Sequence, residues 1–204
     1  MRWEIKSKLT IILILICFSR EAYGNSLPFR VGETFNYIAK FNFIPAGTAI
    51  LKVVSLDTVN NIPSFHIQYS ARTGSLADKL FKIRDQVDSW IDEKGLFIHH
   101  QIKTIRQGNY RKYSNTKLFY ADSFAIVNND SIPISGTVFD PYSLFYYLRT
   151  IPLILGETLN MITFDNGSFT DFQLRVDKRE SLSGPAGTFQ CLVINPFKDG
   201  KTLL

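Results

Sequence analysis

Apolar and polar residues alternate along much of this chain, and a two-residue period is the pattern of β-strands with one buried face. The clearest stretch covers residues 34–43, where one set of side chains is aromatic or small and the other set, apart from Ile38, is polar. The first set comprises Phe35, Tyr37, Ala39, Phe41 and Phe43. Residues 65–72 alternate in the same way, and residues 46–56 between them are apolar on both faces except at Lys52. These three segments predict a meander of antiparallel strands.

Turn residues separate the rest of the chain into further strands. Asp165-Asn166-Gly167 lies between two apolar runs, and Asp/Asn-Gly in that position is a strong hairpin signal. Residues 73–82 lose the alternation and fit a short helical turn, whereas residues 122–136 are polar around an exposed turn at 128–130. The additional strands that we predict are residues 83–92, 96–106, 110–120, 159–164, 169–176 and 188–194.

One segment has a helical pattern. Asp140 is a good N-cap, because its carboxylate accepts hydrogen bonds from the free amides at a helix start, and Pro141 suits the first helical position. Apolar side chains then occupy nearly every face as far as Arg149, and Pro152 follows soon after. A helix that is apolar nearly all round is enclosed by other elements. We therefore predict a mainly β fold, in which a curved antiparallel sheet or half-barrel encloses one short apolar helix.

The first residues have the organisation of a cleavable signal peptide. Lys6 and Lys8 precede an apolar run over residues 9–18, which is too short to span a bilayer, since a spanning helix needs about 20 residues. Ala22 and Gly24 are small, as signal peptidase requires at those two places. We expect cleavage after Gly24, with an uncleaved anchor as the alternative.

Residues 25–204 are then expected to form a single β-rich domain in the periplasm or another extracytoplasmic compartment. No later segment is long and apolar enough to cross a membrane, so the mature chain is not expected to span one. The sequence ends abruptly on Lys201-Thr202-Leu203-Leu204. Two interpretations of this ending stay open, a truncated chain and an ordinary edge strand.

Charge and cysteine content narrow the function classes. The chain has 23 Lys and Arg against 18 Asp and Glu, and removal of the leader leaves 19 against 16, a net charge of +3. That weak positive charge gives no reason to expect a nucleic-acid partner, which would need a concentrated basic face. Cys191 is the only cysteine outside the leader, so no intramolecular disulfide can form and the fold depends on its core. We expect Cys191 to be a buried small apolar residue.

Five segments, taken in order, resemble a known family. They are residues 32–37, 45–49, 84–90, 139–149 and 187–191. Their order and spacing are similar to those of the bacterial exported family called domain of unknown function 3108, and the resemblance covers residues 29–198. It implies a cell-envelope location and a shape similar to the half-barrels of periplasmic lipoprotein carriers. Members of the family usually continue with further strands, and the resemblance supplies no catalytic residue.

Polar clusters give little support for catalysis. His99 and His100 are adjacent, so on a strand they point to opposite faces and do not easily share a metal ion. Asp88 and Asp92 flank Trp90 on one face of a strand, and two such carboxylates about 7 Å apart could in principle act on a sugar. We prefer the interpretation of a solvated face, and we expect no enzyme activity, no cofactor and no metal.

The aromatic content suggests a binding function. Phe, Tyr and Trp make up 14% of the chain and gather in residues 35–43 and in the predicted helix. They indicate either a large core or a cavity between sheet and helix that binds an apolar ligand or a lipid-bearing partner. The candidate binding residues are Arg84, Trp90, Tyr142, Phe145, Tyr146 and Arg149. The alternative functions are an envelope assembly protein that contacts other proteins through a sheet edge, and a polysaccharide hydrolase that uses Asp88 and Asp92.

Overall fold

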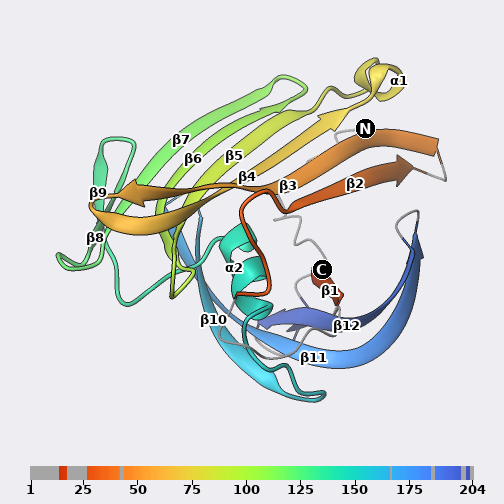
Figure 1. Ribbon diagram of the computed structural model, residues 1–204. Coiled ribbons are helices and arrows are strands. Elements are labelled where there is room, and N and C mark those ends of the chain that lie inside the picture. Colours follow the sequence, from red (N-terminus) through yellow and green to blue (C-terminus); the bar gives the residue numbers. More distant parts are fainter. Residues whose placement is uncertain are drawn as a thin grey trace. The chain divides into compact units, whose positions relative to one another are not determined.

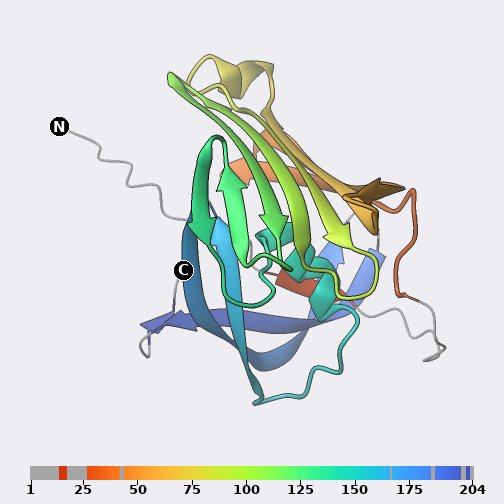
Figure 2. The same cartoon turned by 90° about the vertical axis from the view of Figure 1, so that its left-hand side faces the viewer.

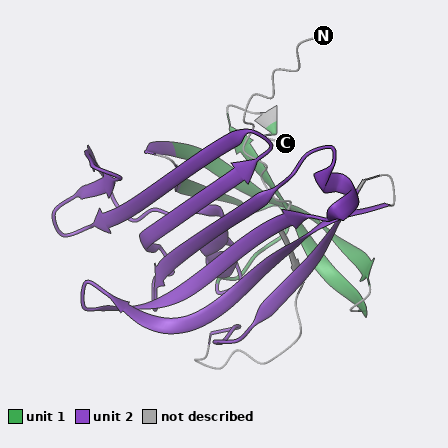
Figure 3. Cartoon of the chain, turned by 90° about the horizontal axis from the view of Figure 1, so that it is seen from above, with its two compact units in different colours: residues 1–26, 151–162, 170–204 green, residues 27–150, 163–169 purple. Residues whose placement is uncertain are grey.

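The computed structural model describes residues 14–17, 27–41, 44–165, 167–184, 187–198 and 201–202 (Figure 1). These residues group into two compact units (Figure 3). Unit 2 comprises residues 27–150 and 163–169. Unit 1 comprises the rest of the chain, residues 1–26, 151–162 and 170–204.

Unit 2 is built on an eight-stranded antiparallel sheet in which each strand pairs with its neighbour in sequence. The sheet is curved and its two edges are β2 and β9, so it does not close into a barrel (Figures 1 and 2). The strands are β2 (Thr34–Phe41), β3 (Ile44–Val59), β4 (Ile62–Thr73), β5 (Arg84–Asp92), β6 (Ile98–Gln107), β7 (Tyr110–Phe119), β8 (Phe124–Val127) and β9 (Asp130–Pro133). The short helix α1 (Ser75–Asp78) joins β4 to β5, and helix α2 (Pro141–Leu148) lies on the concave side of the sheet (Figures 1 and 2).

A second antiparallel sheet, with the order β1-β12-β11-β10, contributes its strands mainly to unit 1. Its members are β1 (Ile14–Cys17), β10 (Thr158–Asp165), β11 (Ser168–Gly184), β12 (Gly187–Lys198) and the two-residue β13 (Lys201–Thr202). β11 and β12 form a long hairpin, and β1 and β13 both pair with β12. Cys191 is buried in β12, as expected of a small apolar residue.

The mainly β fold with a curved antiparallel sheet and an enclosed helix, predicted from alternation and capping, is confirmed. Two segments differ from their predictions. One is β11, which continues to Gly184, well beyond the predicted strand end at residue 176. Residues 122–136 are not simply a polar loop, because they contain the β8–β9 hairpin, which turns at Asn128 with a positive φ of 56°. Ala125 of this hairpin is fully buried. The polar residues around such short strands hide the two-residue period. No helix in the described parts of the chain is long and apolar enough to cross a membrane.

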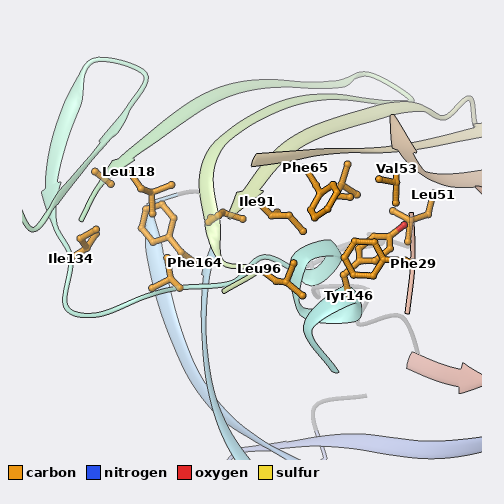
Figure 4. Packing of buried hydrophobic residues seen from close by; sticks show 14 residues of the cluster. Phe29, Leu51, Val53, Phe65, Ile91, Leu96, Leu118, Ile134, Tyr146 and Phe164 are labelled. Atoms are coloured by element: carbon orange, nitrogen blue, oxygen red, sulfur yellow. The ribbon is translucent and has the colours of Figure 1, made fainter. Parts of the chain in front are cut away.

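The core of unit 2 lies between the sheet and α2 (Figure 4). Alternate residues of the central strands contribute their side chains to this core. Val53, Ile67, Ile91 and Ile98 are among them, and each is almost completely buried. Tyr146 of α2 is fully buried among them and its ring meets the ring of Phe29 edge-on, with centroids 4.7 Å apart. We call the face of the sheet that supplies this core the inner face, and the opposite face the outer face.

Asp140 fixes the position of α2 on the inner face. Its carboxylate accepts hydrogen bonds from the backbone amides of Tyr142 and Ser143, at 3.0 and 2.6 Å, and the Ser143 hydroxyl accepts one from the Asp140 amide. The same carboxylate also accepts hydrogen bonds from Ser89 on β5 and Gln101 on β6. Asp140 is fully buried, so one carboxylate both caps the helix and attaches it to two strands.

Replacing Asp140 with Ala should destabilise the protein strongly. The substitution leaves buried donors on Ser89 and Gln101 without their acceptor and removes the cap, which together cost about 2–4 kcal/mol. Urea unfolding followed by circular dichroism measures this loss. The matched control is Asp130→Ala, which removes an exposed aspartate and should change the unfolding free energy little. Equal effects of the two substitutions would contradict the role of Asp140.

Candidate binding site

The candidate residues on α2 are packed against aromatic rings of the sheet. Tyr142 stacks on Tyr69 of β4 with ring centroids 4.7 Å apart, and Phe145 meets Phe35 of β2 edge-on at 5.4 Å. Burial raises the pKa of Tyr142 well above its ordinary value, and burial has the same effect on Tyr146. Both phenols are therefore neutral near pH 7. The Tyr146 hydroxyl is buried and has no hydrogen-bond partner among the described residues.

Arg149, directly after α2, closes the end of this aromatic cluster. Its guanidinium donates two hydrogen bonds to the Glu33 carboxylate, at 2.7 and 2.8 Å, and one to the Pro28 carbonyl at 2.8 Å. It also lies 5.3–5.8 Å from the centroids of four rings, those of Phe29, Phe35, Phe145 and Tyr146. A bidentate ion pair combined with cation–π contacts holds Arg149 in place. Four of the six candidate residues are thus brought together on or beside α2.

Trp90 lies on the outer face instead. Ser89 donates a hydrogen bond to Asp140 at the start of α2, so its side chain lies on the inner face. Successive side chains of a strand point to opposite faces, and Trp90 therefore points away from the helix. The indole is stacked between His66 on β4 and His100 on β6, with centroid separations of 4.5 and 4.8 Å. It also donates a hydrogen bond to Asp57 at 3.0 Å. Trp90 is therefore the middle of a three-ring ladder across the sheet.

The histidines and carboxylates considered for chemistry have separate partners. His66 bonds to Asp88, His99 to Asp92 and His100 to Asn115, at 2.9–3.1 Å. Among the described residues, no group of three or more His, Cys, Asp or Glu side chains is arranged to hold a metal ion. Burial acts to raise the pKa of Asp88 and of Asp92, but hydrogen bonds outweigh it and hold both below their ordinary value. A glycosidase acid needs a raised pKa, so these lowered values do not favour that role.

Arg84, the remaining candidate, also lies on the outer face, where it belongs to a row of four arginines. Arg72 on β4 is the direct cross-strand partner of Arg84 on β5, and Arg106 on β6 is that of Arg111 on β7. The β5–β6 register, in which Gln86 pairs with Thr104 and Ile83 with Gln107, places Arg84 beside Arg106. We call Arg72, Arg84, Arg106 and Arg111 the arginine row. Residues directly opposite each other share a face, so like charges here oppose strand pairing.

Two adjoining hollows follow the arginine row. One, of about 300 Å³, is lined by Arg72 and Arg84 together with residues 47–48 and 73–74. The other, of about 290 Å³, is lined by Lys82, Arg84, Arg106 and Arg111. Arg84 lines both. The nearby carboxylates are already engaged, since Asp78 pairs with Arg84 at 2.6 Å and Asp85 accepts a hydrogen bond from the Arg106 amide at 3.0 Å. Among the described salt bridges, Arg72, Arg106 and Arg111 have no carboxylate partner, and guanidinium groups of this kind suit a phosphate or carboxylate group.

The sequence analysis named Arg84 but not its three neighbours in the row. The predicted strands 96–106 and 110–120 would pair Arg106 with Tyr110, whereas the observed turn is one residue shorter, pairs Gln107 with Tyr110 and so brings Arg106 opposite Arg111. The pairing of Arg72 with Arg84 is harder to predict, because residues 73–82 intervene and the register depends on how that connection folds.

The fold and the site define a mainly β protein with a packed inner face and a basic surface on its outer face. The profile of the family described as "Protein of unknown function (DUF3108)" matches residues 36–203, so the chain belongs to this family. The resemblance inferred from the five sequence segments is thereby confirmed. Comparisons with curated proteins and with solved structures found no match.

Replacing His100 with Gln should reduce the loss of stability at mildly acidic pH. Burial lowers the pKa of His100 from 6.5, and the charge of Lys117 lowers it further, against an opposing hydrogen bond with Asn115. The unfolded chain then binds the proton first, so folding stability falls as the pH drops through about 6.5. Urea unfolding of both proteins at about pH 7.5 and about pH 5.5 measures the difference. Lys52 is exposed, so Lys52→Gln should keep the wild-type pH dependence of stability. An unchanged pH dependence in His100→Gln would show that His100 is not the group whose protonation destabilises the fold.

Proposed function

We propose that the protein is a non-enzymatic cell-envelope protein that binds an amphipathic ligand through an acidic headgroup, such as the phosphate of a lipid. The arginine row is the observation that carries this proposal. Like charges directly opposite each other on neighbouring strands destabilise a sheet, and apart from Asp78 beside Arg84 no carboxylate forms a salt bridge with the row among the described residues. Guanidinium groups bind phosphate oxygens in a bidentate manner, and three of the four, those of Arg72, Arg106 and Arg111, have no carboxylate partner among the described salt bridges.

The location rests on the predicted signal peptide and on the family resemblance, which implies an envelope protein. The lipid class rests on the combination of a basic surface with apolar side chains on the same outer end of the sheet. The cavity between sheet and helix is not part of the proposal, because buried side chains of the core, among them Tyr146, occupy the space between the sheet and α2.

Arg106→Gln should weaken headgroup binding at least about tenfold, because one charge-assisted contact to the anion is lost. It should also leave the fold equally stable or more stable by about 0.2–1 kcal/mol, because the unfavourable pair with Arg111 disappears. Calorimetric titration with a soluble short-chain phosphatidylglycerol measures binding, and urea unfolding measures stability. Arg30→Gln removes an exposed arginine outside the row and is the matched control. Unchanged affinity in Arg106→Gln would refute the site.

A second function, recruitment of another protein at a sheet edge, is favoured by strand β1. Residues Ile14–Cys17 lie within the predicted leader, yet they pair with Ile194–Cys191 of β12. The β12 residues in this register, Cys191 to Ile194, are all buried. Cleavage after Gly24 would remove β1 and leave the edge of β12 open to an incoming strand.

Mass spectrometry of the protein purified from the cell envelope should give a chain that begins at Asn25. This result is expected because the leader has the length and the small residues that signal peptidase requires. A purified chain that still contains Ile14–Cys17 would contradict both the cleavage and the open edge of β12.

A further inference from the structure

The loop between β4 and β5 presents apolar side chains to solvent beside the arginine row. Leu76 is 71% exposed, Leu80 is 91% exposed and Phe81 is 43% exposed, all within six residues. None of the four residues of α1 is buried, so this loop contributes little to the core. Single exposed apolar residues are common on proteins, but a group of three on one projecting loop indicates a contact with another apolar phase.

The loop is held firmly in this exposed position. Asp78 pairs with Arg84, and the Asp78 carboxylate also accepts a hydrogen bond from Thr73 at the end of β4. The hydrogen bond from Arg84 is the main cause that lowers the pKa of Asp78, so the pair stays ionised near neutral pH. We call Leu76, Leu80 and Phe81 the apolar tip. The loop that carries the tip is attached to β5 by the salt bridge between Asp78 and Arg84.

The turn between β6 and β7 supports the loop from the other side. The Gly108 amide donates a hydrogen bond to the Lys82 carbonyl at 2.8 Å. A Cβ at Gly108 would lie 2.7 Å from the Phe81 ring, and Gly108 has a positive φ of 54°, so only glycine allows this close approach. α1 and the β6–β7 turn accordingly occupy the same end of the sheet (Figures 1 and 2). Tyr110, 54% exposed, follows this turn and adds an amphipathic ring at that end.

Positive charges surround the apolar tip. Lys79 and Lys82 are exposed within or directly after the loop, and Arg106 and Arg111 are exposed on the adjacent strands. Of the two carboxylates named at this end, Asp78 is paired with Arg84, and Asp85 accepts hydrogen bonds from neutral groups, so the basic side chains here outnumber the acidic ones. Leucine and aromatic side chains at a tip, with lysine and arginine around them, match the interface of a bilayer that contains anionic lipids.

We propose that this end of the sheet docks on an anionic membrane surface, with Leu76, Leu80 and Phe81 inserted among the acyl chains and the arginine row at the headgroups. The inference deepens the proposed function and rests on it, because the row would meet its headgroup while the lipid is still in the bilayer. Charge complementarity selects a lipid surface over a second copy of this chain, which would bring the same positive end against itself.

Flotation with vesicles tests the docking. The purified protein should float with vesicles of phosphatidylglycerol and phosphatidylethanolamine, should bind phosphatidylcholine vesicles weakly, and should lose binding as salt rises. Leu76→Ser with Leu80→Ser should reduce binding to the anionic vesicles at least about tenfold, since two inserted leucines are lost. The matched control is Ile154→Ser with Leu155→Ser, which changes two exposed apolar residues of unit 1 and should float as the wild type does.

The two proposals fail in different ways. If the leucine variant floats like the wild type, membrane docking is overturned, whatever the affinity for short-chain lipid. If the variant stops floating but still binds short-chain phosphatidylglycerol in solution, the docking and the headgroup site both stand. If neither protein binds the short-chain lipid, the headgroup site and the inference built on it are both refuted. Light scattering without vesicles adds one more outcome, because a wild-type dimer that becomes a monomer in the variant would assign the tip to a second copy.

Discussion

The hydrogen bonds of the Asp140 carboxylate are the constraint on which the arrangement of unit 2 depends. An eight-stranded sheet of this curvature has a wide apolar inner face, and one eight-residue helix covers part of it. Such a short helix is unstable alone, so its place must be fixed by contacts with the sheet. Ser89 and Gln101 provide these contacts at the helix start. Arg149 and Glu33 provide them at the helix end, so both ends of α2 are attached to the strands or the segment before them.

Because the inner face holds the helix and the core, the outer face is free to carry groups that do not stabilise the fold. The arginine row is such a group, since it places like charges opposite each other on four consecutive strands. The ring ladder of His66, Trp90 and His100 on the same face shows the opposite behaviour, in which neighbouring strands stabilise one another by stacking. At the end of the sheet that carries the arginine row, neighbouring strands place repelling side chains opposite each other, and such unfavourable arrangements are expected at functional or strained sites.

The sequence predicts those features that depend on local periodicity and capping. The strands of residues 34–119 and the helix after Asp140 follow from alternation, turn residues and the Asp-Pro start. The β8–β9 hairpin is not predicted by these signals, because a strand of four residues among polar neighbours is too short to show a two-residue alternation. Because successive side chains of a strand alternate between its faces, Trp90 must point away from α2 if Ser89 points toward it. The inward direction of Ser89, however, is known only from its contact with Asp140, fifty-one residues away in sequence. The arginine row likewise requires the register of strands β4 to β7, which is a tertiary property.

Arg84 connects the outer-face site to the exposed loop. Its guanidinium lines both hollows, and the same group pairs with Asp78 inside the loop. The pair therefore links the loop that carries Leu76 and Leu80 to the row, and it neutralises one of the two acidic residues at this end, the other being Asp85. Three arginines of the row remain without a carboxylate partner among the described salt bridges, which leaves the positive charge where a headgroup would meet it. The loop with the apolar tip is thus attached to the basic row through this ion pair, as expected of two parts of the proposed lipid-binding surface.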